Sequence, residues 1–560
     1  MFESPVPVST TNRLRCAVSI ARTSRQCLPC TGTAIRSTSV PRSYDVIVVG
    51  SGFGGGIAAC RLAEAGKRVC VLERGRRFAR EDFPEDPEQA PGMLWHETAN
   101  PGGLFDVRMM RDLSVITAAG VGGGSLVYAN VQLRAPADIF EQNWPSAITR
   151  DELDPWYDRT EEALQPRPTP AEPALPKVRA FAAAGGHTGK DATLLPIAVH
   201  FGEARKHPFS GVLQEGCQNL GRCDLGCPVH AKNTIDITYL ARAEANGAEV
   251  RPLHLVRGIE PPQSSGESWQ VTFKDLDNGE EGAIEAPTVV LAAGTLGSSR
   301  LLLTNRRRLP KLSPALGTRF SGNGDALGIA FDPSAADVRG AQNDYGPVMT
   351  SKLDYTAERR LIVADGGLPA NFDVLLDIAR GVNVIRGWRR ALLRFRDAMI
   401  RLGWSDQAMH PRQLGLAEGR PDTDSLVVLM IGRDAADGRM RLSPLFHRFD
   451  IRWSKAGSAQ LFADLERTAK ELATASGATP FYALEGGPLS KFTTVHPLGG
   501  CPMADDPSQG VVDDEGRVYA YPGLYVLDGS IVPTALGVNP SKTIAALAER
   551  GVARLRETIA

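Results

Sequence analysis

The sequence predicts an α/β protein built around a Rossmann-type sheet that binds a dinucleotide. Three observations support this fold class. A strand, a glycine turn, a helix and a second strand follow one another over residues 45–73. Further strand–turn–helix patterns occur at residues 289–300 and 523–550. Alternation of short apolar strands with helices is typical of parallel sheets, and the wide separation of these segments predicts a discontinuous domain.

The first pattern has the order that dinucleotide binding requires. A β-branched run at 45–50 ends in Gly-Ser-Gly-Phe-Gly-Gly, which places Gly50, Gly52 and Gly55 at the dinucleotide spacing. These glycines permit a tight turn, close approach of the backbone to a pyrophosphate, and packing of the helix on the strand. The helix expected over 57–65 presents its N-terminus to the phosphates. Glu73, at the end of the second strand, is expected to accept the ribose hydroxyls.

A second group of small residues is expected beside the same ligand. Residues 120–125 read Gly-Val-Gly-Gly-Gly-Ser, which indicates a backbone that passes close to something flat or bulky. The buried strand that begins at Val289 ends in a glycine turn at Gly294. The predicted cofactor-binding residues in these two segments are Gly120, Gly122, Gly123, Ser125 and Gly294.

The C-terminal region contains two further motifs. Residues 495–503 read Val-His-Pro-Leu-Gly-Gly-Cys-Pro-Met. A strand at 524–527 is followed by a loop that holds Asp528 and Asn539, and a helix is expected from Ser541. Asn539 therefore stands where a helix begins, so that its side chain and the helix N-terminus can face one ligand.

Together, these four ordered motifs resemble those of the glucose-methanol-choline (GMC) oxidoreductases, and most of all their cholesterol oxidase branch. The resemblance runs from residue 45 to the end and is weak over about 330–490. It implies non-covalent FAD as the cofactor and oxidation of an alcohol by hydride transfer to the flavin. It also implies that His496 takes the hydroxyl proton, that Asn539 positions the alcohol oxygen, and that Asp528 lies near the flavin.

The sequence departs from this branch at two places. Tyr128 stands where some cholesterol oxidases have an asparagine. Those relatives that also isomerise the product use a buried glutamate, and the matching region here offers Asp365 as a candidate base. Isomerase activity and sterol specificity are therefore open from the sequence.

The predicted fold is thus an FAD domain with an α+β substrate domain built on an antiparallel sheet. We assign residues 45–140, 211–325 and 490–560 to the FAD domain, and 141–210 and 326–489 to the substrate domain. Residues 1–44 contain six arginines and one acidic residue. Their composition resembles a transit peptide, and a disordered extension or a misplaced start codon are the alternatives.

A cysteine-rich loop leaves three interpretations open. Cys217, Cys223 and Cys227 have the spacing C-x5-C-x3-C, with a proline after the last. The spacing resembles that of GMC sugar dehydrogenases with a three-iron cluster. A zinc site that uses His230 is the second interpretation, and a flavin-covering loop with reduced, structural cysteines is the third.

The composition limits the possible partners. The net charge is −1, so no nucleic-acid partner is expected, and no apolar run is long enough to span a membrane. Apolar residues recur every three or four positions over 385–402, with six arginines between them. This basic helix is either a lid that contacts a membrane surface or an ordinary surface helix, and the expected location is cytoplasmic or at a membrane surface.

The leading hypothesis is FAD-dependent oxidation of a sterol-like or long-chain apolar alcohol, with O2 or an electron-carrier protein as the acceptor. The second is an iron–sulfur dehydrogenase of a sugar or polyol that passes electrons to a protein. The third is a flavin-binding protein without alcohol chemistry. The main argument against it is that His496 and Asn539 are both present.

Overall fold

The computed structural model describes residues 44–84, 92–264, 266–331, 333–367, 425–443, 448–482 and 492–559. Residues Ser43–Ala560 form one unit. The N-terminal extension and the expected basic helix at 385–402 lie outside the described residues. None of the described helices is long and apolar enough to cross a membrane.

A parallel sheet of five strands carries the predicted nucleotide motif. Its order is β21 (Leu524–Val526), β12 (Thr288–Leu291), β1 (Val46–Val49), β2 (Val69–Leu72) and β8 (Glu249–Arg251). Every neighbouring pair is parallel. Four segments far apart in the chain therefore build one sheet, which confirms the predicted α/β class with a Rossmann-type sheet.

Both faces of this sheet are covered, which explains why its central strands are apolar throughout. On one face, Val46, Val48 and Val290 pack with α1 (Phe53–Glu64) and α10 (Ser541–Thr558). On the other face, Ile47 and Val289 pack with α5 (Gly294–Thr304) and with an antiparallel sheet. That three-stranded sheet consists of β9 (His254–Glu260), β10 (Trp269–Asp275) and β11 (Glu281–Ala286).

An antiparallel sheet of six strands forms the second large element, as predicted. Its order is β19 (Thr479–Tyr482), β13 (Ala326–Phe331), β16 (Leu426–Gly432), β15 (Leu361–Asp365), β14 (Ser351–Tyr355) and β5 (Thr193–Leu194). Residues of α9 (Ala459–Ala475) and α3 (Pro176–His187) share a hydrophobic cluster with its strands. The apolar positions of α9 recur at helical spacing and form one buried face.

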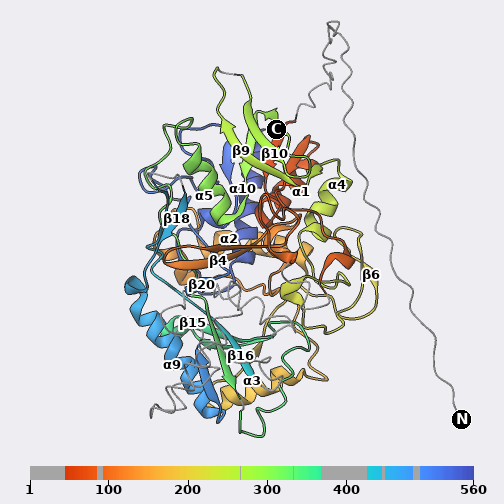
Figure 1. Cartoon of the computed structure of the whole chain (residues 1–560), viewed down its shortest axis with the longest axis vertical. Helices are drawn as coiled ribbons and strands as arrows, with labels where there is room; N and C mark the ends of the chain where they lie inside the picture. The colour runs from red at the N-terminus through yellow and green to blue at the C-terminus, as the bar shows by residue number, and fades with distance from the viewer. Residues whose placement is uncertain are drawn as a thin grey trace, which may run out of the picture. The chain divides into compact units, whose positions relative to one another are not determined.

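A small sheet lies between these two regions in Figure 1, where β4 and β20 appear between the β9–β10 end and the β15–β16 end. β20 (Phe492–Thr494) pairs in parallel with β4 (Leu113–Ala118), which pairs antiparallel with β3 (Phe105–Met109). β20 ends two residues before His496, and β13 begins one residue after Asp325. These two strand ends position the candidate site.

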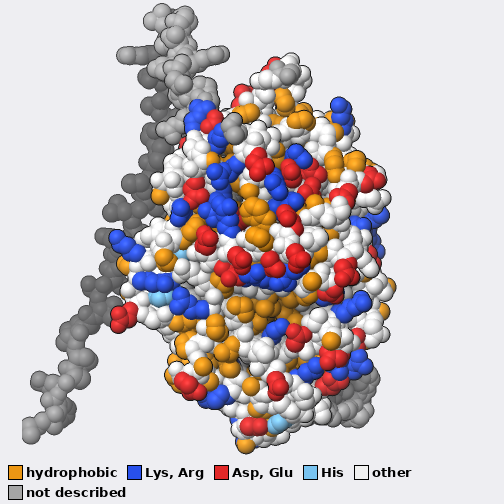
Figure 2. Space-filling view, turned by 180° about the vertical axis from the view of Figure 1, so that it is seen from behind, with side chains coloured by type: hydrophobic (Ala, Val, Ile, Leu, Met, Phe, Trp, Pro, Cys, Tyr) orange, Lys and Arg blue, Asp and Glu red, His pale blue; other side chains and the backbone are white. Residues whose placement is uncertain are grey.

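The structure describes further α-helices and β-strands outside these sheets. They are α2 (Arg150–Leu164), α4 (Ala241–Ala245), α6 (Thr356–Arg359), β6 (Arg205–Lys206), β7 (Leu213–Gln214), β17 (Arg439–Leu442) and β18 (Phe449–Arg452). Basic and acidic side chains are intermingled on the face that Figure 2 shows, in keeping with the net charge of −1.

Candidate active site

The nucleotide turn brings three chain segments into contact at the carboxyl end of β1. Gly50 has φ +97°, a left-handed conformation that a side chain would strain. A Cβ atom on Gly55 would lie 2.0 Å from the Gly50 carbonyl oxygen, and one on Gly54 would lie 1.5 Å from that of Leu527. α1 therefore begins directly against β1 and β21, with its first N–H groups at the sheet edge where a pyrophosphate is bound in this fold.

The second glycine loop lies against this turn. Gly122 and Gly123 have φ values of +112° and +57°, and a Cβ atom on Gly123 would lie 2.6 Å from the Cα atom of Gly52. Ser125 holds the loop, because its Oγ donates to the Gly122 carbonyl oxygen at 2.7 Å and accepts from the Ile235 N–H at 2.9 Å. The two glycine segments thus form one cradle of backbone.

Glu73 is part of the same cradle. Ser51 Oγ donates to Glu73 Oε2 at 2.7 Å and accepts from the Gly122 N–H at 3.1 Å, so it joins Glu73 to the glycine loop. The Gly75 N–H donates to Glu73 Oε1 at 2.8 Å. Burial raises the pKa of Glu73, although the hydrogen bonds from Ser51 and Gly75 oppose this effect. The structure therefore places Glu73 beside Gly52, Gly122 and Gly123.

Asp528 joins the end of β21 to the start of α5. Its Oδ2 accepts from the Gly294 N–H at 2.9 Å and from Ser298 Oγ at 2.5 Å, and its Oδ1 accepts from the Ser530 N–H at 2.9 Å. Burial raises its pKa against these hydrogen bonds. Protein donors already contact both oxygens, so Asp528 ties together two strand ends that border the cradle.

His496 and Asn539 are attached to the same turn, residues 321–325. His496 Nδ1 lies 2.7 Å from Asp325 Oδ1. The Leu536 and Gly537 N–H groups donate to Asn323 Oδ1 at 2.9 and 3.0 Å, just before Asn539. The turn therefore connects the two candidate catalytic residues, although more than forty residues separate them in the sequence.

Asn539 has unsatisfied hydrogen-bonding capacity. It is 6% exposed, and among the described residues its Oδ1 has no hydrogen-bond partner and its Nδ2 has only the Met349 thioether sulfur, at 3.9 Å. Sulfur is a weak acceptor. A polar group buried in this way costs about 1–3 kcal/mol unless a ligand satisfies it, so the Asn539 amide is suited to contact a bound molecule.

Asp365 is already bonded by the two residues that follow Met349, the contact of Asn539. The Thr350 and Ser351 N–H groups donate to its Oδ1 at 2.7 and 2.6 Å, and the Thr350 hydroxyl donates to its Oδ2. Lys177 Nζ lies 3.4 Å from Oδ2, and both side chains are almost fully buried. Four donors thus contact the carboxylate that the sequence offered as a base.

The residues around the cradle fit a dinucleotide. Asn130 is fully buried, and neither atom of its amide has a hydrogen-bond partner in the described part of the chain. Asp236 Oδ1 is also buried without a partner, and it lies 3.3 Å from the position of a Cβ atom built on Gly122. Unpaired polar atoms of this kind are rare in native interiors. The position of Asp236 Oδ1 beside the glycine cradle is what a polar cofactor requires.

Sequence reasoning missed four of these residues: Asn130, Asp236, Asn323 and Asp325. Asn130 has φ +67° and follows the glycine loop by only a few residues, which is the one signal that could have found it. The other three belong to no motif, and their neighbours in the fold come from distant segments.

The cysteine-rich loop does not form a recognisable metal centre. Cys217, Cys223 and Cys227 are free thiols that pack against a small apolar cluster with Val131 and Ile197. Burial, together with the smaller effect of the neighbouring Cys223, raises the pKa of Cys217 to about 12. Within the described ranges, no group of three or more His, Cys, Asp or Glu side chains is placed to hold a metal ion. The iron–sulfur and zinc interpretations gain no support from this geometry.

His230 is engaged elsewhere. Its Nδ1 accepts from Arg80 Nε at 3.3 Å. Lys232 is buried beside the loop and donates to the carbonyl oxygens of Leu126 and Cys223 at 2.9 and 2.6 Å. Burial lowers the pKa of Lys232 to about 8. These contacts attach the cysteine loop to the end of the glycine loop, which favours the interpretation of a structural, cofactor-covering loop.

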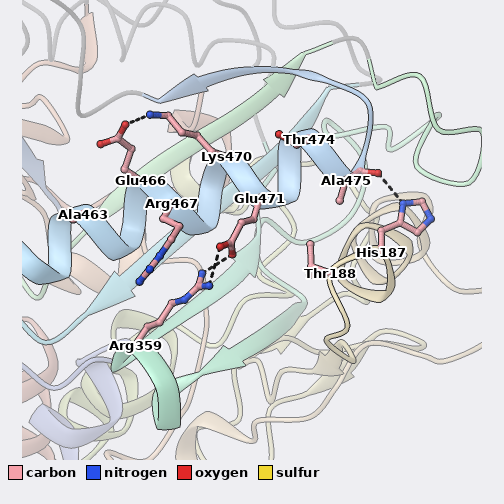
Figure 3. Close-up of a pocket in the computed structure, with 10 residues that line it drawn as sticks. All are labelled: His187, Thr188, Arg359, Ala463, Glu466, Arg467, Lys470, Glu471, Thr474 and Ala475. Atoms are coloured by element: carbon pink, nitrogen blue, oxygen red, sulfur yellow. Dashed lines mark hydrogen bonds and ion pairs between the residues drawn. The ribbon is translucent and has the colours of Figure 1, made fainter.

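A surface pocket of about 880 Å³ lies elsewhere, along α9 and the end of α3. Figure 3 shows that charged side chains line it and that several of them are paired, including Arg359 with Glu471 and Lys470 with Glu466. None of the predicted site residues lines this pocket. It is therefore distinct from the glycine cradle and from the turn that holds His496 and Asn539.

Comparison with known proteins agrees with this geometry. Residues 44–306 and 434–548 match the two family models described as GMC oxidoreductase. A cholesterol oxidase of Mycobacterium tuberculosis (strain CDC 1551 / Oshkosh) is 32% identical over 540 residues, which cover 90% of each chain. A cholesterol oxidase of Acinetobacter baumannii is 30% identical over 549 residues, covering 91% of this chain and 94% of the relative.

More distant relatives share the fold. The long-chain-alcohol oxidase FAO4B of Arabidopsis thaliana is 24% identical over 540 residues, covering 89% of this chain and 65% of the relative. The crystal structure of pyridoxine 4-oxidase from Mesorbium loti superposes with a TM-score of 0.61 at 17% identity, covering 92% of this chain and 99% of that chain. The matched regions span more than half of the sequence, and the chain therefore belongs to the GMC oxidoreductases as an FAD-dependent oxidoreductase that acts on CH–OH donors.

Proposed function

We propose that this enzyme oxidises the hydroxyl group of an apolar alcohol, sterol-like or long-chain, with His496 as the base and Asn539 as the group that positions the alcohol oxygen. The observation that carries the proposal is the state of the His496 ring. Nδ1 is bonded to Asp325 at 2.7 Å, whereas Nε2 has no hydrogen-bond partner among the described residues. The side chain is 20% exposed, so Nε2 is accessible.

The chain's own residues would divide the work as follows. His496 Nε2 accepts the hydroxyl proton as the C–H bond of the alcohol is broken. Asn539 Nδ2 donates to the alcohol oxygen, for which the Met349 sulfur at 3.9 Å is a weak competitor. FAD, when bound, accepts the hydride. Gly50, Gly52, Gly55, Glu73 and the loop from Gly120 to Ser125 would hold it.

The choice of an apolar alcohol rests on the relatives that are named cholesterol oxidase and long-chain-alcohol oxidase. The thioether of Met349 beside Asn539 is consistent with an apolar site. The iron–sulfur dehydrogenase hypothesis is not favoured, since the cysteine loop lacks a metal-ligand set within the described ranges. The acceptor that reoxidises the flavin is either O2 or a carrier protein.

The experiment is anaerobic mixing of the FAD-loaded protein with cholesterol, a long-chain primary alcohol or sorbitol, while the flavin absorbance is followed. Iron and sulfide are assayed on the same sample. We expect bleaching by one of the two apolar alcohols, no bleaching by sorbitol, and no iron. His496→Gln should slow the bleaching by about 10²–10⁴-fold, the usual range for loss of a general base, while it retains FAD.

The matched control is His187→Gln. His187 also bonds an aspartate, Asp337, at 2.9 Å, but it lines the surface pocket. This control should reduce its flavin at the native rate. Flavin that is bleached only by sorbitol, with about three irons per flavin, would replace the proposal by the iron–sulfur dehydrogenase. A flavin that no alcohol bleaches would leave a binding protein without alcohol chemistry.

A further inference from the structure

Both oxygens of the Asp325 carboxylate contact residues 494–496, the segment that contains the candidate base. Its Oδ1 faces His496 Nδ1 at 2.7 Å. Its Oδ2 accepts from Thr494 Oγ1 at 2.9 Å, from the Val495 N–H at 2.9 Å and from the His496 N–H at 3.1 Å. The side chain is 10% exposed. One carboxylate thus binds both the backbone and the ring of the candidate base.

This arrangement determines which ring nitrogen carries the proton. An ionised carboxylate only accepts hydrogen bonds, so Nδ1 is the N–H, and in the neutral imidazole Nε2 then carries the lone pair. Two of the three donors to Oδ2 are backbone N–H groups, which are fixed by the chain. The carboxylate therefore cannot turn away from the ring, and the ring cannot rotate without breaking the bond at Nδ1.

The same turn also anchors Asn539. Asn323 Nδ2 donates to the Val538 carbonyl oxygen at 2.9 Å, and its Oδ1 accepts from Leu536 and Gly537. Asp434 Oδ2 holds the turn from the other side by accepting the Gly322 N–H at 2.9 Å. Asn323, with φ +55°, and Asp325 thus point from one anchored turn to two loops that are distant in the sequence.

We propose that Asp325 is the positioning residue of this enzyme, which fixes the tautomer and orientation of His496, and that the turn 321–325 sets the relation of His496 to Asn539. The inference rests on the proposed function, because it requires His496 to act as the base. Asp325 acts only through His496 and does not itself contact the alcohol.

The test is Asp325→Asn in the FAD-loaded, full-length enzyme. The donors around Oδ2 would hold the amide oxygen, which leaves the amide NH2 facing Nδ1. His496 would then accept at Nδ1 and carry its proton on Nε2, the wrong tautomer for a base. Such a change costs about 10⁴-fold in kcat in a serine protease, and we expect a loss of about 10²–10⁴-fold here, with KM changed by less than about threefold and FAD retained.

Two comparisons separate positioning from a general structural role. The first is Asp337→Asn, which changes an aspartate that is bonded to His187 on the surface and should leave kcat unchanged. Asp325→Asn combined with His496→Gln should be no slower than His496→Gln alone, because a residue that acts only through His496 has nothing further to remove. A native kcat in Asp325→Asn, or a double variant slower than His496→Gln, overturns the inference.

If Asp325→Asn does not fold, Thr494→Val decides the question by the same comparison. It removes one donor to Oδ2 and retains the carboxylate, so we expect a loss of less than about tenfold in kcat that disappears in the His496→Gln background. A loss that persists in that background contradicts the inference. Native flavin reduction in His496→Gln itself would instead refute the proposed function, and this result is read from the single variant alone.

Discussion

The C-terminal helix is joined to the nucleotide-binding helix by a buried ion pair, and its removal should destabilise the whole unit. Glu549 on α10 is 1% exposed, and Arg61 on α1 is 5% exposed. Arg61 donates to both carboxylate oxygens, with Nη2–Oε1 at 2.8 Å and Nε–Oε2 at 2.9 Å. The Tyr239 hydroxyl donates to Oε1 at 2.9 Å. Burial opposes the charge of Arg61, but Glu549 more than offsets this, so the pKa of Arg61 lies above its ordinary value.

The magnitude follows from this burial. Breaking a buried ion pair by removing one partner costs about 3–5 kcal/mol, because an unpaired charge remains inside. Arg61 has a second partner, Glu64, at 3.0 Å, which retains part of the compensation. We therefore expect Glu549→Gln to lower the free energy of unfolding by about 3 kcal/mol, at the low end of this range. With an m value of about 3 kcal/mol/M or more, the urea midpoint falls by at most about 1 M.

The assay is urea unfolding of the native enzyme, Glu549→Gln, Arg61→Met and Arg61→Met/Glu549→Leu, followed by tryptophan fluorescence. The double variant should recover much of the loss, since apolar pairs often replace buried ion pairs at little cost. Asp45→Asn is the control, because it breaks the exposed pair with Arg68 at 2.7 Å and should cost less than about 1 kcal/mol. A Glu549→Gln loss no larger than that of Asp45→Asn would refute the reasoning.

Two further predictions concern the glycine turn and the pH dependence of stability. Gly54→Ala should abolish FAD retention, because its Cβ would lie 1.5 Å from the Leu527 carbonyl oxygen. The control is Gly186→Ala, at an open position of α3, which should retain FAD and leave the free energy of unfolding unchanged or slightly raised. The flavin-to-protein absorbance ratio measures both, and normal flavin content in Gly54→Ala would contradict the packing. Burial, aided by nearby positive groups, lowers the pKa of His207 from 6.5 to about 4. Between these values the unfolded chain binds the extra proton, so stability should fall as the pH falls from about 6.5 to 4, by about 2 kcal/mol once solvent screening is allowed for. In His207→Gln, the urea midpoint should depend less on pH between about 6.5 and 4. An unchanged pH dependence would show that other groups cause the loss of stability.

Elements with local sequence signals could be predicted before the fold was known. The strand before Gly50, the turn, the helix and Glu73 lie within thirty residues, and each has a residue type that its conformation requires. Helix α1 begins at Phe53, four residues before the helix expected at 57, because the glycines of the turn continue directly into it. The parallel direction of the strands was also predictable, since short apolar strands that alternate with helices are typical of parallel sheets.

The contacts of the candidate site join residues that are far apart in the sequence, so no local pattern could predict them. Asp325 and His496 are 171 residues apart in the sequence, and Asp528 and Gly294 are separated by 234. Asp365 has the residue type of a base, but the donors that surround it come from Lys177 and from Thr350 and Ser351 at the start of β14. Whether a carboxylate orients a histidine, ties two strands together or is buried in an ion pair depends on which donors the fold brings to it. The packing of distant segments therefore determines the role of each carboxylate, whereas the sequence pattern indicates only which residues could have such a role.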